Sequence, residues 1–157
     1  TKASADQLAI SYYYSFNLPV TILRPFNTFG PRQSMRAVIP TIIGQVINSN
    51  RVNIGNVKPT RDFTFVTDTV EAFSRAIKAK NINGEVINIG SNFEVSIKEI
   101  IEMVASITNR KIVINKDLKR MRPKSSEVDR LLCSNKKAKY LLKWSPSSGG
   151  KKGFKAC

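Results

Sequence analysis

Three segments of the sequence carry side chains that could hold an anionic ligand. Asn27 follows the run Arg24-Pro25-Phe26, and its side-chain amide can donate hydrogen bonds to a phosphate or bind the hydroxyls of a sugar. Arg61 precedes alternating aromatic residues that would anchor it, and a guanidinium held in this way suits bidentate phosphate binding. Arg122 lies in a basic loop that could close over the same anion. Together these segments predict a site for a phosphorylated small molecule.

Each segment also has an ordinary structural interpretation. Asn27 could lie in a plain exit from a strand into a loop, and Arg61 could form an ion pair with Asp62 or with Asp68. A loop arginine such as Arg122 is most often simply solvated. For Asn27 and Arg61, the residues alone leave the binding and structural interpretations evenly balanced.

The composition excludes several kinds of catalysis within these 157 residues. The chain has no histidine, which removes Ser-His-Asp hydrolysis, Cys-His proteolysis and histidine-bound zinc. Cys133 and Cys157 are too few for a disulfide framework and lack the spacing of a metal site, so no metal is predicted. The eight glycines form neither a Gly-x-Gly-x-x-Gly turn after a strand nor a Walker A loop.

The net charge of +15, from 26 Lys+Arg against 11 Asp+Glu, would attract polyanions. The basic residues are spread along the chain, and no aromatic-interleaved RNA-binding pattern accompanies them. Nucleic-acid binding is therefore the weaker interpretation beside a phosphorylated small molecule. No apolar run approaches the ~20 residues that span a bilayer, and no secretory signal opens the chain. We therefore expect a cytoplasmic protein without membrane contact.

Strands alternate with helices, which predicts an α/β fold. The expected helices cover residues 3–16, 38–47, 69–80, 97–107 and 135–142. The expected strands cover residues 20–23, 52–54, 63–66, 86–89 and 111–114, with loops at 24–36 and 120–126. Capping residues are expected at Asp68 with Glu71, at Ser96 with Glu99, and at Ser134. Trp144 should pack back on the body, whereas residues 145–157 should form a weakly ordered tail.

In order along the chain, these motifs resemble the extended short-chain dehydrogenase/reductase family of NAD-dependent nucleotide-sugar epimerases and dehydratases. The resemblance covers residues 1 to about 144. It rests on residues 1–6 (the end of a Tyr-x-x-x-Lys motif), 24–32 (the nucleotide-sugar loop), 60–68 (Arg-Asp-Phe/Trp-x-x-Val-x-Asp), 86–90 (an Asn-Ile-Gly strand), 122–123 and 134–142. It implies the C-terminal part of a Rossmann-type, doubly wound fold with its small substrate-binding α/β subdomain.

By this resemblance the cofactor is NAD, held mainly by residues that would precede Thr1. Lys2 would be the catalytic lysine, which holds the nicotinamide ribose and lowers the pKa of a tyrosine four residues earlier. The backbone at Pro25 and Phe26 would face the nicotinamide. Because neither that tyrosine nor a glycine loop lies within the 157 residues, we expect them to be inactive alone.

The resemblance also assigns the substrate site. Asn27, Arg61 and Arg122 would hold the diphosphate of a nucleotide sugar. Arg36 is a further substrate-binding residue, and the region from Val38 to Ile42 would line the uracil side. Residues 37–41 and 126–131 favour a 4,6-dehydratase of UDP-N-acetylhexosamines, which oxidises sugar C4 and eliminates water. A 4-epimerase, a UDP-glucuronate decarboxylase and a non-enzymatic polyanion-binding module are the alternatives. In the full-length enzyme, the first helix would pack in a four-helix bundle that joins two subunits in a homodimer.

Overall fold

The computed structural model describes residues 1–148 and 151–155 of the chain. The helices are α1 (Lys2–Phe16), α2 (Val38–Asn48), α3 (Val66–Lys78), α4 (Ile97–Ile107), α5 (Lys136–Leu141) and α6 (Lys151–Lys155), with 3-10 turns η1 (Leu118–Arg120) and η2 (Lys124–Ser126). The strands are β1 (Ile22–Pro25), β2 (Asn27–Phe29), β3 (Arg51–Ile54), β4 (Thr60–Phe65), β5 (Val86–Ile89), β6 (Glu94–Ser96), β7 (Val113–Lys116) and β8 (Arg130–Leu131). The predicted α/β class is confirmed.

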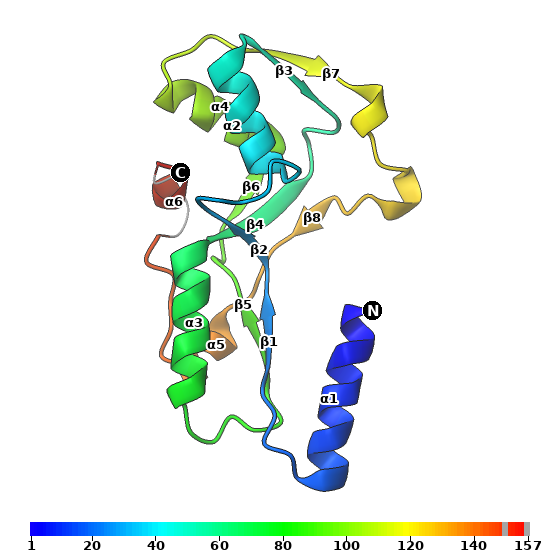
Figure 1. The fold of residues 1–157 in the computed structure, drawn as a ribbon, viewed down its shortest axis with the longest axis vertical. Coiled ribbons are helices and arrows are strands. Elements are labelled where there is room, and N and C mark those ends of the chain that lie inside the picture. Colours follow the sequence, from blue (N-terminus) through cyan, green and yellow to red (C-terminus); the bar gives the residue numbers. More distant parts are fainter. Residues whose placement is uncertain (149–150, 156–157) are drawn as a thin grey trace.

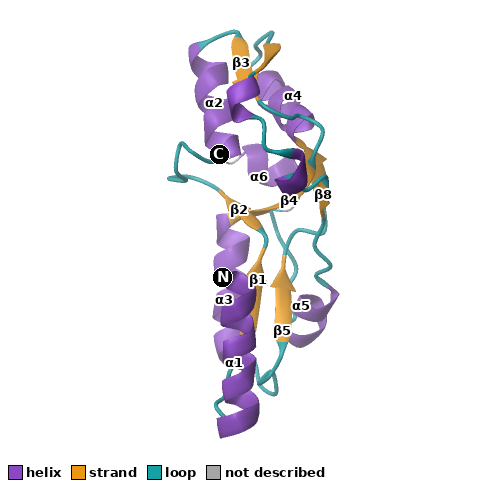
Figure 2. Cartoon of the chain, turned by 90° about the vertical axis from the view of Figure 1, so that its right-hand side faces the viewer, coloured by secondary structure: helices purple, strands orange, loops and turns teal. Residues whose placement is uncertain are grey.

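The molecule is elongated and has two parts joined by the strand β4 and its neighbours (Figure 1). One part holds the parallel pair β1–β5 with α1, α3 and α5, and the other holds the parallel pair β3–β7 with α2 and α4. Between them, β4 pairs with β2 and β8 in parallel and with β6 antiparallel. The view turned by 90° shows the same division along the long axis (Figure 2). The two parts therefore meet at β4.

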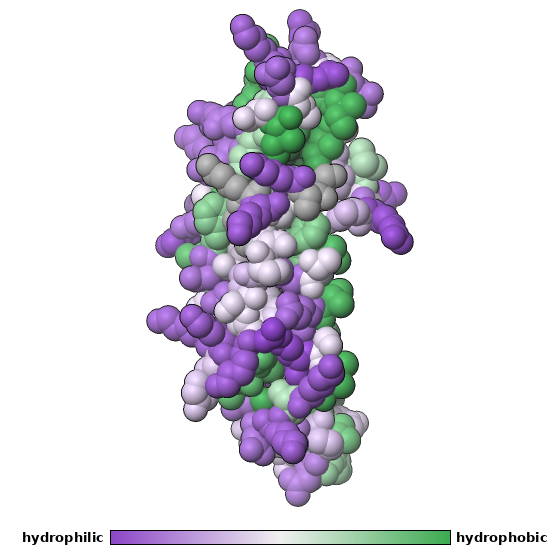
Figure 3. Space-filling view, turned by 90° about the vertical axis from the view of Figure 1, so that its left-hand side faces the viewer, coloured by the Kyte–Doolittle hydropathy of each residue, from purple (hydrophilic) through white to green (hydrophobic). Residues whose placement is uncertain are grey.

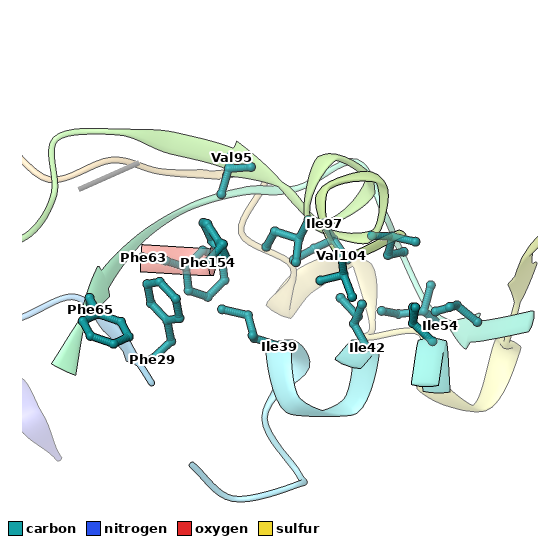
Figure 4. Packing of buried hydrophobic residues seen from close by; sticks show 14 residues of the cluster. Phe29, Ile39, Ile42, Ile54, Phe63, Phe65, Val95, Ile97, Val104 and Phe154 are labelled. Atoms are coloured by element: carbon teal, nitrogen blue, oxygen red, sulfur yellow. The ribbon is translucent and has the colours of Figure 1, made fainter. Parts of the chain in front are cut away.

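Each part has its own hydrophobic cluster. The larger cluster joins α2 and α4 to β2, β4 and β6, and includes Phe29, Ile42, Phe63 and the tail residue Phe154 (Figure 4). The smaller cluster joins α3, β5 and α5 around Trp144, which is fully buried as the sequence predicts. Burial of these side chains stabilises each part, at roughly 25 cal/mol per Å² of apolar surface.

Several helix boundaries follow from the sequence. The capping box at Ser96 and Glu99 is confirmed, because the Ser96 hydroxyl accepts from the Glu99 backbone N–H and the Glu99 carboxylate accepts from the Ser96 N–H. The helix α2 begins at Val38, and Pro40 lies in its first turn, where no backbone donor is needed. Among the described residues, no helix is long and apolar enough to cross a membrane.

Two predicted caps are wrong. The helix α3 begins at Val66, and the Asp68 carboxylate accepts hydrogen bonds from Ser147 and Ser148 in the tail. The helix α5 follows Asn135, not Ser134, and no side chain of the described residues caps it. An Asp or Ser near a helix start can satisfy other donors, and here a distant segment supplies the donors for Asp68.

Three short strands differ from the sequence prediction. The segment expected to be a loop at 24–36 contains β2, and the strands β6 and β8 have no predicted counterpart. All three pair with β4 and have only two or three residues. Such strands are too short for an alternating pattern, so they form because β4 offers a partner.

Candidate functional site

A cleft of about 540 Å³ lies beside β4 and receives residues from β2, α2, β4 and the chain between β7 and β8. It brings together all five residues that the sequence assigns to substrate binding: Asn27, Arg36, Val38, Arg61 and Arg122. These residues are separated by up to 95 positions, so only the fold could place them together. Their roles stay predictions, but their shared position is a property of the structure.

Strand pairing places Asn27 and Arg61. Asn27 lies opposite Phe63 in the β2–β4 register, and its side-chain amide donates to the carbonyl oxygen of Asp62 at 3.3 Å. Successive residues of a strand point to opposite faces. Accordingly Arg61 and Phe63 line the cleft, whereas Asp62 points away from it into the protein. The amide of Asn27 is thus oriented by the backbone of the strand that carries Arg61.

Asp62 fastens β4 to two other segments. Its fully buried carboxylate accepts hydrogen bonds from the backbone N–H of Ser91 (2.8 Å), Asn92 (2.9 Å) and Cys133 (3.1 Å), and from the Ser91 hydroxyl (2.6 Å). Burial, with the nearby Asp62 charge as a smaller cause, raises the pKa of Cys133 to about 12, so this thiol stays protonated. The role of Asp62 is therefore to hold the site together.

Arg61 has a different acidic partner from the two that the sequence suggests. Its Nη2 lies 3.4 Å from Oε1 of Glu127, and its Nη1 donates to the carbonyl oxygen of Thr60 at 2.8 Å. Asp62 and Asp68 are instead occupied by Ser91, Asn92, Cys133 and the tail serines. Glu127 also lines the cleft, so this ion pair belongs to the site itself.

The charge of the cleft favours anions. Four arginines line it, namely Arg36, Arg61, Arg120 and Arg122, against the single carboxylate of Glu127. Arg120 contacts Asp117 at 3.2 Å, whereas the guanidinium groups of Arg36 and Arg122 have no partner within the described residues. Like charges gathered in a concave surface raise the local potential and concentrate ligands of opposite sign.

A second ion pair fixes the edge of the site. Arg130 of β8 donates two hydrogen bonds to Glu94 of β6, at 2.8 and 2.7 Å, and the Thr60 hydroxyl donates to the same carboxylate at 2.9 Å. These hydrogen bonds, first that from Arg130 and then that from Thr60, lower the pKa of Glu94. Because β8 follows the segment that carries Arg122 and Glu127, this ion pair anchors that segment to β4.

Comparison with known proteins shows the family and the fold of the chain. The family model described as GDP-mannose 4,6 dehydratase matches residues 1–157. The dTDP-D-glucose 4,6-dehydratase of Dictyostelium discoideum is 38% identical over 109 residues, 69% of this chain and 25% of that protein. The solved UDP-glucuronic acid 4-epimerase of Bacillus cereus, in complex with UDP-glucuronic acid and NAD, has a TM-score of 0.88 and 32% identity over 99% of this chain and 49% of its own.

The chain belongs to the extended short-chain dehydrogenase/reductase family of NAD-dependent epimerases and dehydratases. A second solved member, the RMD protein of Pseudomonas aeruginosa complexed with NADPH, has a TM-score of 0.88 at 28% identity, again over 99% of this chain and 52% of its own. The predicted membership of a Rossmann-type family is thereby confirmed. The chain spans about half the length of these solved relatives, and a quarter of the Dictyostelium protein.

The three residues that the family resemblance assigns to the cofactor lie outside the cleft lining. Lys2 begins α1 and is exposed, and its ammonium has no partner within the described residues. Pro25 ends β1, and the backbone N–H of Phe26 donates to the carbonyl oxygen of Ile89 at 2.8 Å. An exposed ammonium is able to donate to ribose hydroxyls, so the position of Lys2 is compatible with the role that the resemblance gives it, which stays a prediction. The described part of the chain offers no pyrophosphate-binding turn.

Several residues that line the cleft were not predicted from the sequence. Arg120 lines it beside Arg122, and both belong to the basic loop 120–126 that the sequence indicates. Gln33 also lines it, donating from its amide to the carbonyl oxygen of Thr28 at 2.9 Å. Nothing in the local sequence pairs Glu127 with Arg61, because 66 residues separate them.

Proposed function

We propose that this chain forms the nucleotide-sugar-binding portion of an NAD-dependent nucleotide-sugar 4,6-dehydratase, with a UDP-N-acetylhexosamine as the favoured substrate. The observation that carries the proposal is the meeting of Asn27, Arg61 and Arg122 in one arginine-rich cleft. Membership of the epimerase/dehydratase family supports it, since relatives are named as dehydratases and epimerases of nucleotide sugars.

Different residues of the cleft would bind different parts of the nucleotide sugar. Arg61 is largely buried and held by the Thr60 carbonyl, so it offers a guanidinium of fixed orientation to the diphosphate. Arg122 and Arg36 are exposed and their guanidinium groups have no partner within the described residues, so they would close over the remaining phosphate oxygens. Val38 and Phe63 supply the apolar surface against which the nucleoside would pack.

The chemistry would take place beside Lys2. NAD, when bound, supplies the acceptor for the hydride that leaves sugar C4. The Lys2 ammonium would favour the ionised form of a neighbouring tyrosine, and that tyrosinate would take the C4 hydroxyl proton. Loss of water across C5–C6 and return of the hydride to C6 would then give the dehydrated ketosugar. Since the 157 residues contain neither a tyrosine four positions before Lys2 nor a glycine loop, we propose that they bind substrate without converting it.

A 4-epimerase or a UDP-glucuronate decarboxylase is the second candidate. The solved epimerase that matches this chain holds UDP-glucuronic acid. An excess of arginines over carboxylates in the cleft would also accept the additional negative charge of a sugar carboxylate. The preference between UDP-N-acetylglucosamine and UDP-glucuronic acid therefore separates the two candidates.

The proposal also includes a homodimer of the full-length enzyme, formed in part through α1. No residue of this helix is buried, and it exposes the large apolar side chains of Leu8, Tyr12 and Phe16. An apolar helix face of this kind is typical of a protein interface. Sedimentation of the wild type and of Leu8→Glu tests it, and a monomeric wild type would contradict it.

Titration calorimetry of the 157-residue protein tests the binding. We expect UDP-N-acetylglucosamine to bind and Arg61→Ala to weaken it about 10- to 100-fold, because charge-assisted hydrogen bonds are lost. Arg51→Ala is the matched control, since Arg51 is an exposed arginine outside the cleft lining. An equal loss in both variants would contradict a specific site.

Two further readouts complete this experiment. With NAD and UDP-N-acetylglucosamine added, we expect no ketosugar, and its formation would refute the proposed inactivity. Binding of DNA that falls steeply with salt, without any preference for UDP-sugars, would instead favour the polyanion-binding module. Figure 3 shows one face of the molecule, on which hydrophilic side chains are spread from end to end among smaller apolar patches.

A further inference from the structure

Glu127 differs from the other carboxylates around the cleft in how loosely it is held. Asp62 accepts four hydrogen bonds, and Glu94 accepts two from Arg130 and one from Thr60. Glu127 makes one polar contact within the described residues, to Arg61 Nη2 at 3.4 Å. This distance is longer than the 2.7–2.9 Å of a strong charge-assisted hydrogen bond. Its single contact is therefore readily exchanged.

The contact involves the part of Arg61 that a phosphate would need. Nη1 of Arg61 is already engaged by the Thr60 carbonyl, so Nη2 is the end of the guanidinium that faces Glu127 and the cleft. Both side chains are only 15–16% exposed. A carboxylate and a phosphate cannot share this position, because two like charges at such separation repel each other strongly.

The chain around Glu127 permits its displacement. Glu127 lies between η2 and β8, and its neighbours Ser126 and Val128 are exposed. Moving this side chain would not disturb either hydrophobic cluster, since neither contains a residue of this segment. The anchor that holds the segment, Arg130 with Glu94, would stay in place.

We propose that the Glu127 carboxylate competes with the ligand for Arg61. A ligand phosphate must displace this carboxylate, and the exchange sets the affinity of the cleft for phosphate-bearing ligands. This inference rests on the proposed function, because it concerns the same cleft. Binding exchanges one singly charged carboxylate for a phosphate on the same guanidinium. A ligand without phosphate cannot make this exchange, so Glu127 affects charged ligands alone.

The test compares Glu127→Gln with Glu102→Gln. Both remove one negative charge, but Glu102 lies on α4, outside the cleft lining, paired with Lys98. Calorimetry uses inorganic pyrophosphate, UDP-N-acetylglucosamine and uridine. We expect Glu127→Gln to tighten the first two about 3- to 10-fold, because it releases Arg61 Nη2 from a single long contact, and to leave uridine unchanged. Glu102→Gln should change none of them by more than about twofold.

A double-mutant cycle ties the effect to Arg61. In an Arg61→Ala background, Glu127→Gln should no longer tighten binding, because no guanidinium is left to compete for. Weaker or unchanged binding by Glu127→Gln would overturn the inference, since the carboxylate would then contact the ligand itself or have no effect. Failure of wild type and variants alike to bind either phosphate ligand would overturn the proposed function instead. Circular dichroism confirms that each variant is folded.

Discussion

At the scale of single residues, β4 combines structural and binding roles in alternation. Arg61 and Phe63 face the cleft, whereas the buried carboxylate of Asp62 between them holds three backbone N–H groups in place. A buried carboxylate is stable only when it is fully hydrogen-bonded. The same strand thus presents a cation to ligand on one face and uses an anion to fix its neighbours on the other.

The ionisation of Glu94 predicts that the stability of the protein depends on pH. Hydrogen bonds from Arg130 and Thr60 lower its pKa below the ordinary value of 4.5. A carboxylate with a lowered folded pKa stabilises the protein fully above the unfolded value and loses this contribution as pH falls through the folded pKa. We therefore expect the wild type to lose stability faster than Glu94→Gln below pH 4.5.

Urea unfolding at roughly pH 7, pH 5 and pH 3 measures this difference. At neutral pH the wild type should be the more stable protein, and the two should converge as the medium becomes acidic. Arg130→Ala should show the same convergence, because it removes the main cause of the shift. Parallel pH curves for wild type and Glu94→Gln would show that the ion pair does not stabilise the fold.

At the scale of elements, the sequence predicts the long helices and the strands that have their own pattern. Helical periodicity indicates α1, α2 and α4, and the capping box places the start of α4 correctly. The short strands β2, β6 and β8 could not be predicted, because their pairing with β4 is set by residues far away in the chain.

The same limit applies to the candidate site. Motifs indicate Asn27, Arg61 and Arg122, whose types suit a diphosphate, and the fold brings them into one cleft. Glu127 could not be paired with Arg61 from local spacing, since its position depends on β8 lying beside β4. Asp68 has the pattern of a helix cap, yet its carboxylate serves serines some 80 positions later.

Gly55 controls the approach of one element to another. It is buried in the cleft lining, and a Cβ added there would lie 2.4 Å from the carbonyl oxygen of Arg120. That contact is with backbone, so the segment holding Arg120 and Arg122 would have to move away. We expect Gly55→Ala to weaken UDP-N-acetylglucosamine binding about 10-fold, since small displacements of oriented groups are costly.

The control for this prediction is Gly44→Ala. Gly44 lies inside α2, and its added Cβ would meet only the flexible end of Met35, at 2.9 Å. Alanine is also the better helix former, so this variant should keep its affinity and its stability. Calorimetry with both variants checks the prediction. Unchanged affinity in Gly55→Ala would mean that the arginine segment can shift without loss of binding.

At the scale of the whole molecule, the chain after Trp144 joins the two hydrophobic clusters. Trp144 belongs to the smaller cluster, and its indole N–H donates to the carbonyl oxygen of Asp68 at 3.0 Å. Ser147 and Ser148 then bond to the Asp68 carboxylate, and Phe154 enters the larger cluster. The sequence suggests a weakly ordered tail here because only Phe154 is strongly apolar, whereas the structure gives the described tail residues specific partners.

Phe154 therefore provides the last test, because it links the tail to the floor of the cleft. Its ring stacks on Phe29 with centroids 4.6 Å apart and meets Phe63, which lines the cleft, edge-on at 6.3 Å. Truncating a buried phenylalanine costs about 3–5 kcal/mol in a well-packed core. We expect Phe154→Ala to lower the free energy of unfolding by about 2–4 kcal/mol, slightly less because one end of the chain can relax.

Urea unfolding measures this loss against Lys155→Ala, whose exposed side chain should matter by less than about 0.5 kcal/mol. Because Phe63 loses a packing partner, the same variant should also bind UDP-N-acetylglucosamine more weakly, which Lys155→Ala should not. Equal stability of the two variants would mean that the tail does not pack in the core in solution. A loss of stability without a loss of affinity would mean that Phe63 keeps its position in the cleft without Phe154.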